Sequence, residues 1–164
     1  MIRPATPRDF AAMGAIEVAA GELFREFGMS RIADDPPPTP ADLDGHAAAW
    51  VAVEDDGEFA GYLVADRIDD ACHIEQVSVH PAHSRRGIGA SLVDTAAGWA
   101  RANGLGALTL TTFADVPWNA PYYSRLGFVA LPESALTPAL RAKVLAEAGH
   151  GLDPLARVVM RRAV

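Results

Sequence analysis

The sequence of 164 residues is long enough for one compact domain with a buried core, and we expect a single domain over residues 1–164. Hydrophobic residues make up 50% of the chain and charged residues 21%, a composition that excludes wholesale disorder. The formal net charge of −7 excludes the broad basic surface that long nucleic-acid contacts need.

The first forty residues predict a strand, two helices and a loop. Residues 2–5 form the expected strand, and residues 6–9, Thr-Pro-Arg-Asp, have the pattern of a helix start. Apolar residues at helical spacing continue this helix through Ala20, and residues 21–29 predict a second short helix. The prolines of residues 34–40 exclude regular structure there.

The middle of the chain predicts three neighbouring antiparallel strands. Residues 50–68 contain two apolar runs on either side of Asp55-Asp56-Gly57, which is a strong hairpin signal. Residues 72–80, CHIEQVSVH, alternate in polarity and are rich in β-branched residues. They predict a third strand beside the hairpin.

After these strands the chain alternates between helix and strand. Residues 88–104 carry apolar side chains at helical spacing and end at Asn-Gly, which is typical of a helix stop. Residues 107–113 predict a strand, and residues 120–127 a short helix. Strand 128–131, helix 137–148 and strand 156–164 complete the order. It predicts a mixed α/β fold with a mostly antiparallel sheet flanked by helices, not an all-parallel doubly wound domain.

The cysteine content and the hydropathy of the sequence indicate the expected cellular compartment of the protein. Cys72 is the single cysteine, which excludes an intrachain disulfide and fits a reducing compartment. The N-terminal residues MIRPATPRDF contain no apolar signal region, and no stretch has the length of a membrane span. We therefore expect a cytoplasmic protein with neither a membrane nor a nucleic acid as partner.

Residues 80–93, HPAHSRRGIGASLV, join the third strand to the long helix. The first N–H groups of such a helix are unpaired and lie at the positive end of its macrodipole, so they suit a phosphate. Gly87 and Gly89 let a phosphate approach the backbone, and Arg85 and Arg86 add positive charge. Taken alone, such a segment is more often only a turn. It matches neither the dinucleotide fingerprint nor the nucleoside-triphosphate P-loop.

Two segments resemble the GNAT superfamily of N-acetyltransferases. In that family a Val-x-Val-x-Pro strand leads into a (Gln/Arg)-x-x-Gly-x-(Gly/Ala) loop and a helix, as VSVHPAHSRRGIGASLV does here, with Ser84 in place of the usual Gln or Arg. Residues 118–128, WNAPYYSRLGF, resemble the family's Asn-…-Tyr-x-x-x-Gly-Phe segment, with a shorter gap after Asn119. The expected order of elements agrees with the GNAT fold over residues 2–164. The matching residues are Val77, Val79, Pro81, Gly87, Ile88 and Gly89 in the first segment, and Tyr123, Gly127 and Phe128 in the second.

The resemblance implies transfer of an acetyl group from acetyl-CoA to a primary amine of a small molecule or peptide. Transfer would be direct, in a ternary complex, because Cys72 has no activating partner evident in the sequence. The family uses the backbone of the strand for the pantetheine arm, and the loop and helix start for the pyrophosphate. The cofactor contacts that this implies are Val77, Ser78, Val79, Ser84, Arg85, Arg86, Gly87, Ile88, Gly89, Ala90 and Asn119.

Two residues are candidates for catalysis. The resemblance gives Tyr123 the role of general acid for the leaving thiolate, and a reference pKa near 10 keeps a phenol protonated at neutral pH. Glu75 is the candidate base, acting directly or through a water, because it shares a strand face with Val77 and Val79. An acidic anchor for a cationic substrate and a solvated strand residue are the alternatives for Glu75. His73 shares this face and is a weaker candidate.

The remaining histidines show no paired metal-ligand spacing, so we expect no metal. They are His46, His80, His83 and His150.

The acceptor and the partners are less well defined. The resemblance implies that residues 20–34 and 131–153 wall the acceptor site, and that homodimers occur in the family. Asp34, Asp35 and Glu75 would favour a cationic amine if they converge. An alternative from another class is a non-catalytic CoA-sensing, ligand-sensing or interaction module that keeps the GNAT fold. The Ser84 departure supports that alternative, and the tyrosine of the second segment argues against it.

Overall fold

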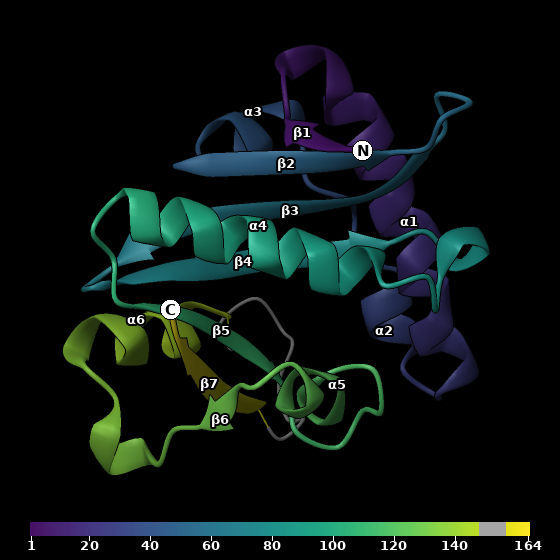
Figure 1. Ribbon diagram of the computed structural model, residues 1–164. Coiled ribbons are helices and arrows are strands. Elements are labelled where there is room, and N and C mark those ends of the chain that lie inside the picture. Colours follow the sequence, from purple (N-terminus) through teal and green to yellow (C-terminus); the bar gives the residue numbers. More distant parts are fainter. Residues whose placement is uncertain (148–156) are drawn as a thin grey trace. The chain divides into compact units, whose positions relative to one another are not determined.

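The computed structural model describes residues 1–147 and 157–164 of the chain (Figure 1). The chain divides into two compact units. Unit 1 contains Met1–Asp66 and Glu75–Ala96, and unit 2 contains the described residues of Arg67–Ile74 and Ala97–Val164. The described strands have the order β1-β2-β3-β4-β5-β7-β6 in one sheet, in which β4 pairs parallel with β5 and the pairs β1–β2, β2–β3, β5–β7 and β6–β7 are antiparallel. The predicted mixed α/β class with flanking helices is confirmed.

The strands of unit 1 begin with the predicted hairpin. Strand β1 (Ile2–Pro4) pairs antiparallel with β2 (Ala48–Val53), and β2 pairs antiparallel with β3 (Phe59–Ile68). Strand β4 (Ala71–Val79) contributes its second half to unit 1. The backbone N–H of His80 just after β4 donates to the carbonyl of Ala60 at 2.8 Å, which ties the end of β4 to β3. The hairpin and the third strand are therefore where the sequence predicts them.

The helices before the hairpin differ from the prediction. Helix α1 runs from Phe10 to Glu26 after a short 3-10 turn, and α2 (Ser30–Ala33) follows it. The predicted separate helix over residues 21–29 is wrong, because the good helix formers of this stretch simply extend α1.

One further short helix was not predicted. Helix α3 (Pro40–Asp44) begins inside the segment that its prolines seemed to exclude from regular structure. Thr39 caps it, and the Asp42 carboxylate accepts from the Thr39 backbone N–H at 2.8 Å. A capped start with proline in the first turn tolerates the residue that would break a helix interior.

The core of unit 1 lies between α1 and the hairpin. Adjacent residues of β3 point to opposite faces, so Tyr62 joins this core while Gly61 faces helix α4 (Ile88–Ala102). Gly61 permits the close approach of α4, because a Cβ on it would meet the Ser78 carbonyl oxygen at 2.9 Å and Ile88 at 3.3 Å. The buried core residues on the α1 side are Phe10, Met13, Ile16, Leu43, Val51, Tyr62 and Val64.

Unit 2 is built on the parallel pairing of the first half of β4 with β5 (Ala107–Phe113), from Ala71 opposite Ala107 to Ile74 opposite Leu110. Strand β5 also pairs antiparallel with β7 (Arg157–Ala163), which pairs with β6 (Val129–Ala130). Helix α5 (Ala120–Arg125) and helix α6 (Pro138–Glu147) are the predicted short and late helices. The last residue predicted for the late helix, 148, and the first predicted for the closing strand, 156, lie outside the described residues.

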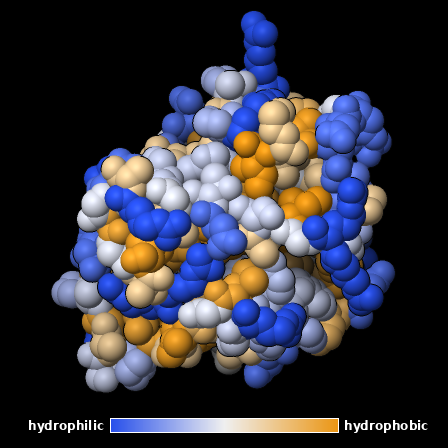
Figure 2. Space-filling view, in the orientation of Figure 1, coloured by the Kyte–Doolittle hydropathy of each residue, from blue (hydrophilic) through white to orange (hydrophobic). Residues whose placement is uncertain are grey.

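The described surface is mixed in polarity. Figure 2 shows hydrophilic and hydrophobic side chains interspersed over the visible face. None of the helices in the described part of the chain is long and apolar enough to cross a membrane. The exposed large hydrophobic residues are Met1, Val18, Phe27, Val129 and Leu145, which are scattered along the chain.

Candidate active site

The loop between β4 and α4 has a left-handed backbone at two positions. Ser84 follows the short 3-10 helix Pro81–His83 in an extended conformation. Arg85 then has a φ of 62° and Gly87 a φ of 78°. Glycine adopts this conformation freely, whereas an arginine does so at a steric cost of a kind that clusters at functional sites.

The start of α4 presents its first backbone donors directly after this loop. The Ser91 N–H donates to the Gly87 carbonyl at 3.0 Å. The N–H groups of Ile88, Gly89 and Ala90 precede that bond in the chain and belong to the first turn, where helix donors lack an intrahelical acceptor. Unpaired donors at the start of a helix suit an anion, so this geometry supports the predicted phosphate site, which stays a prediction.

The two arginines of the loop have different surroundings. Arg86 forms an ion pair with Glu54 at 3.0 Å, and its guanidinium lies 3.1 Å from His83 Nδ1. His83 Nε2 in turn lies 3.3 Å from a carboxylate oxygen of Glu58. Arg85 is exposed. Sequence reasoning did not single out Glu54, because it comes from the turn after β2 and only the fold brings it to the loop.

Two side chains of β4, those of Gln76 and Ser78, contact Glu17 of α1. Ser78 Oγ donates to Glu17 Oε2 at 2.6 Å, and Gln76 Nε2 donates to Ser78 Oγ at 2.8 Å and to both Glu17 oxygens at 3.3 Å. The side chain of Ser78 is therefore engaged by α1, which leaves its backbone for the predicted contact with the cofactor. Val77 and Val79 are half-buried. Sequence reasoning missed Glu17, which lies 61 positions before Ser78.

The candidate base, Glu75, interacts with a second carboxyl group in unit 1. Burial raises the pKa of Asp66, but hydrogen bonds with His46, the Ala47 N–H and Glu75 outweigh it and hold that pKa below its usual range. His46 Nδ1 lies 2.8 Å from Asp66 Oδ2, and the Ala47 N–H donates to Oδ1 at 2.8 Å. Glu75 therefore lies beside the Asp66 carboxylate, which His46 and the Ala47 N–H hold.

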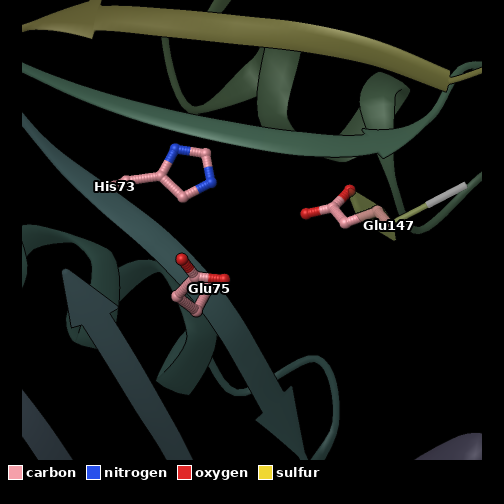
Figure 3. Close-up of side chains that lie close together, drawn as sticks. All are labelled: His73, Glu75 and Glu147. Atoms are coloured by element: carbon pink, nitrogen blue, oxygen red, sulfur yellow. The ribbon is translucent and has the colours of Figure 1, made fainter. Parts of the chain in front are cut away.

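His73 precedes Glu75 on β4 and lies in unit 2. It is fully buried, and its Nδ1 lies 2.8 Å from the Thr109 hydroxyl of β5. Figure 3 shows His73 and Glu75 projecting from the same strand, with the Glu147 carboxylate turned toward the His73 ring. A ring nitrogen of His73 and a Glu147 oxygen lie within 4.8 Å of one another. The expected absence of a metal stays a prediction, and His150 lies outside the described residues.

The candidate general acid, Tyr123, lies on α5 in unit 2. Its side chain is buried, and its ring meets Tyr122 and Phe128 edge-on, with centroids 5.3 and 5.8 Å away. Burial, with a smaller effect of Tyr122, raises the pKa of Tyr123 well above its usual value. The hydroxyl therefore keeps its proton at neutral pH, which a general acid requires.

Asn119 begins α5, since its carbonyl accepts from the Tyr123 N–H at 3.0 Å. Its side-chain Oδ1 accepts from the Thr112 hydroxyl at 2.8 Å. Its Nδ2 is buried and has no hydrogen-bond partner among the described residues. Because buried donors are almost always paired, an orphaned one is a natural contact for a ligand acceptor. Asn119 thus carries a donor of the kind that the predicted cofactor contact needs.

Comparison with known proteins agrees with this description. The family model for the Acetyltransferase (GNAT) family matches residues 17–128, well over half of the chain. The chain therefore belongs to the GNAT acetyltransferase family, and its general activity is acetyl transfer.

Solved structures share the fold at low sequence identity. A GNAT-family acetyltransferase from Staphylococcus aureus Mu50 has a TM-score of 0.76 and 13% identity, covering 99% of this chain and 98% of that one. Ribosomal-protein-S18-alanine N-acetyltransferase from Escherichia coli has a TM-score of 0.69 and 16% identity, covering 100% and 93%. N-acetylglutamate synthase from Neisseria gonorrhoeae, solved with coenzyme A and N-acetylglutamate, has a TM-score of 0.73 and 19% identity, covering 99% of this chain and 34% of that one.

Proposed function

We propose that the protein transfers an acetyl group from acetyl-CoA to a primary amine of a small molecule or peptide, directly in a ternary complex. The observation that carries the proposal is the left-handed backbone of Arg85 and Gly87 immediately before α4. This segment lies within the residues that the family model matches. Solved relatives supply further support, since one of them was crystallised with coenzyme A.

The residues of unit 1 fit the phosphate end of the cofactor. The first-turn N–H groups of Ile88, Gly89 and Ala90 would bind the pyrophosphate, with Arg85 adding charge and Ser84 a hydroxyl. In the same proposal, the backbone of Val77, Ser78 and Val79 pairs with the pantetheine arm. Arg86 would contribute less to pyrophosphate binding than an unpaired arginine, because it already forms an ion pair with Glu54. Asn119 is a further proposed cofactor contact, through its buried Nδ2.

The catalytic residues would handle two protons. Acetyl-CoA supplies the activated thioester when it is bound. Glu75 takes the proton that the amine loses as the new N–C bond forms. Tyr123 gives its proton to the sulfur as the C–S bond breaks. Cys72 is fully buried, which supports direct transfer over a route through an acetylated cysteine.

Two variants test the proposal. Gly89→Val adds a branched side chain at the first turn of α4 and should weaken acetyl-CoA binding at least roughly tenfold by calorimetry. Gly98→Val makes the same change later in α4, where a Cβ meets nothing within 4 Å, and should bind like the parent. Equal binding by both variants would reject the phosphate site.

Tyr123→Phe removes only the proposed acidic proton. It should lower kcat for amine-dependent release of CoA by about 10²-fold or more while leaving acetyl-CoA affinity unchanged. An unchanged kcat would reject the acid role. The shape of the buried ring is kept, so its edge contacts with Tyr122 and Phe128 persist.

Three broader expectations remain part of the proposal. They are a single catalytic domain over residues 1–164, a cytoplasmic location and a homodimer. Light scattering on the purified protein measures the last of these directly.

A further inference from the structure

Glu17 carries a carboxylate that only uncharged groups hold among the described residues. Its Oε2 accepts from the Tyr62 hydroxyl at 2.8 Å and from the Ser78 hydroxyl at 2.6 Å. Gln76 Nε2 donates to both carboxylate oxygens at 3.3 Å. Tyr62 and Ser78 are buried, whereas Glu17 is half-buried. The structure therefore fixes a negative charge at a defined place on α1 without neutralising it.

Three other carboxylates of unit 1 that are not exposed, those of Asp9, Glu54 and Asp66, have cationic or imidazole partners. Asp9 pairs with Arg3 at 2.8 Å, and Glu54 pairs with Arg86 at 3.0 Å. Asp66 pairs with His46 at 2.8 Å. Partial burial of a carboxylate is costly without a counter-ion, and these pairs follow that rule. Glu17 departs from it, which indicates that its counter-ion comes from a ligand.

Glu17 keeps part of its surface exposed to solvent. The buried residues of α1 all precede it and are Phe10, Met13 and Ile16. One turn further along the same face, Ala20 is small, whereas a Cβ on Gly21 would lie 3.9 Å from the Ala33 backbone of α2. A ligand cation would therefore reach the carboxylate through the exposed part of Glu17.

Glu17 is also linked to the strand that the proposed reaction uses. Ser78 lies in the segment of β4 whose backbone is proposed to bind the pantetheine arm, and its side chain donates to Glu17. The charge of Glu17 is thus held on the α1 face of that strand. We propose that Glu17 binds a positively charged group of the acceptor and so selects amines that carry a second cationic group. This inference rests on the proposed acetyl transfer and names the substrate class that it would take.

In a purely structural role, Glu17 would hold α1 against β3 and β4 through its hydrogen bonds with Tyr62 and Ser78. Such a role needs an acceptor for the Tyr62 and Ser78 hydroxyls but needs no charge. Glutamine in place of Glu17 keeps an acceptor oxygen of nearly the same shape, so a fastening role survives it largely intact. The charge itself is what distinguishes the two roles, and only acceptor selectivity reports on it.

The test compares Glu17→Gln with the parent enzyme on matched pairs of acceptors. One pair is 1,4-diaminobutane and butylamine, and another is lysine amide and norleucine amide, which differ mainly in the second cationic group. In the parent, kcat/KM should favour the cationic member roughly tenfold or more. In Glu17→Gln that preference should vanish through a rise in KM for the cationic member, with kcat unchanged within about threefold.

Tyr62→Phe is the matched control, because it removes one donor to the carboxylate and keeps the charge. It should lower thermal stability and retain the preference for the cationic acceptor. A preference that persists in Glu17→Gln, or that is absent in the parent, overturns the inference. Failure of the proposed function is recognised separately, by calorimetry and by an activity assay. A parent protein that does not bind acetyl-CoA, or that binds it and acetylates no amine of either kind, rejects the proposed acetyl transfer and the role of Glu17 together.

Discussion

Arg86 and Glu54 form an ion pair of 3.0 Å that joins the loop before α4 to the turn after β2. The pair places a negative charge beside the loop that is proposed to bind the cofactor pyrophosphate. A carboxylate so placed opposes a phosphate ligand through space and occupies the arginine that would otherwise face it. If the loop binds acetyl-CoA as proposed, we expect Glu54 to lower its affinity for the cofactor.

Replacement of Glu54 tests this relationship. Glu54→Gln should bind acetyl-CoA about two- to fivefold more tightly at low salt, because Arg86 is released and one negative charge is removed. The gain should shrink as salt rises. Isothermal calorimetry at two salt concentrations measures both effects.

Glu58→Gln is the control for the Glu54 variant. It removes an equal charge from a residue that lies near His83 rather than Arg86. It should change the affinity less than Glu54→Gln does. Weaker binding by Glu54→Gln would show that the carboxylate positions Arg86 for the phosphate instead of competing with it.

The fit of α4 against β3 depends on Gly61. A Cβ at this position would meet the Ser78 carbonyl oxygen at 2.9 Å, with Ile88 and Leu92 side chains at 3.3 Å. Gly61→Ala should therefore lower the free energy of unfolding by about 1–3 kcal/mol, measured by urea denaturation. Gly98→Ala, in open space on α4, should raise it by up to about 1 kcal/mol. If Gly61→Ala and Gly98→Ala change the free energy of unfolding equally, α4 can move away from β3 without loss of stability.

The partly buried pair of Asp9 and Arg3 makes the free energy of unfolding depend on pH. Asp9 accepts from both Arg3 terminal nitrogens at 2.8 Å and from the Thr6 N–H at 2.7 Å. The hydrogen bonds from Arg3 outweigh desolvation and hold the pKa of Asp9 well below its usual range. A carboxyl whose folded pKa is depressed adds stability above its unfolded pKa, near 3.9, and loses it as the pH falls toward the folded value.

Asp9→Asn reports on this contribution. The variant should be less stable than the parent by about 1–3 kcal/mol at pH 7, because a charge-assisted network becomes a neutral one. The difference should narrow as the pH falls below about 4. Thermal or urea unfolding across pH 2–7 measures it. If the stability difference between Asp9→Asn and the parent stays constant from pH 2 to 7, the loss of stability comes from changed side-chain geometry and not from the lost charge.

The features predicted correctly from sequence are those that local pattern decides. The hairpin around Asp55-Asp56-Gly57 and the long helix from Ile88 follow from turn chemistry and apolar spacing within short windows. The segment from Thr39 shows the opposite case. Its capped helix start was readable in principle, but the run of prolines before it dominated the interpretation.

The partners of the site residues were beyond sequence reasoning. Glu17 meets Ser78 across 61 positions, and Glu54 meets Arg86 across 32, so only the packing of elements brings them together. Asp34 likewise pairs with Arg25, a partner that its sequence position did not indicate. The motif indicates candidate cofactor contacts, whereas the charged residues next to them come from distant parts of the sequence.

The most direct test of the account is calorimetric titration of the purified protein with acetyl-CoA, with Gly89→Val and Gly98→Val titrated alongside. The account predicts a dissociation constant on the order of micromolar for the parent and Gly98→Val, and much weaker binding by Gly89→Val. Absence of binding by the parent up to about millimolar acetyl-CoA would contradict the account.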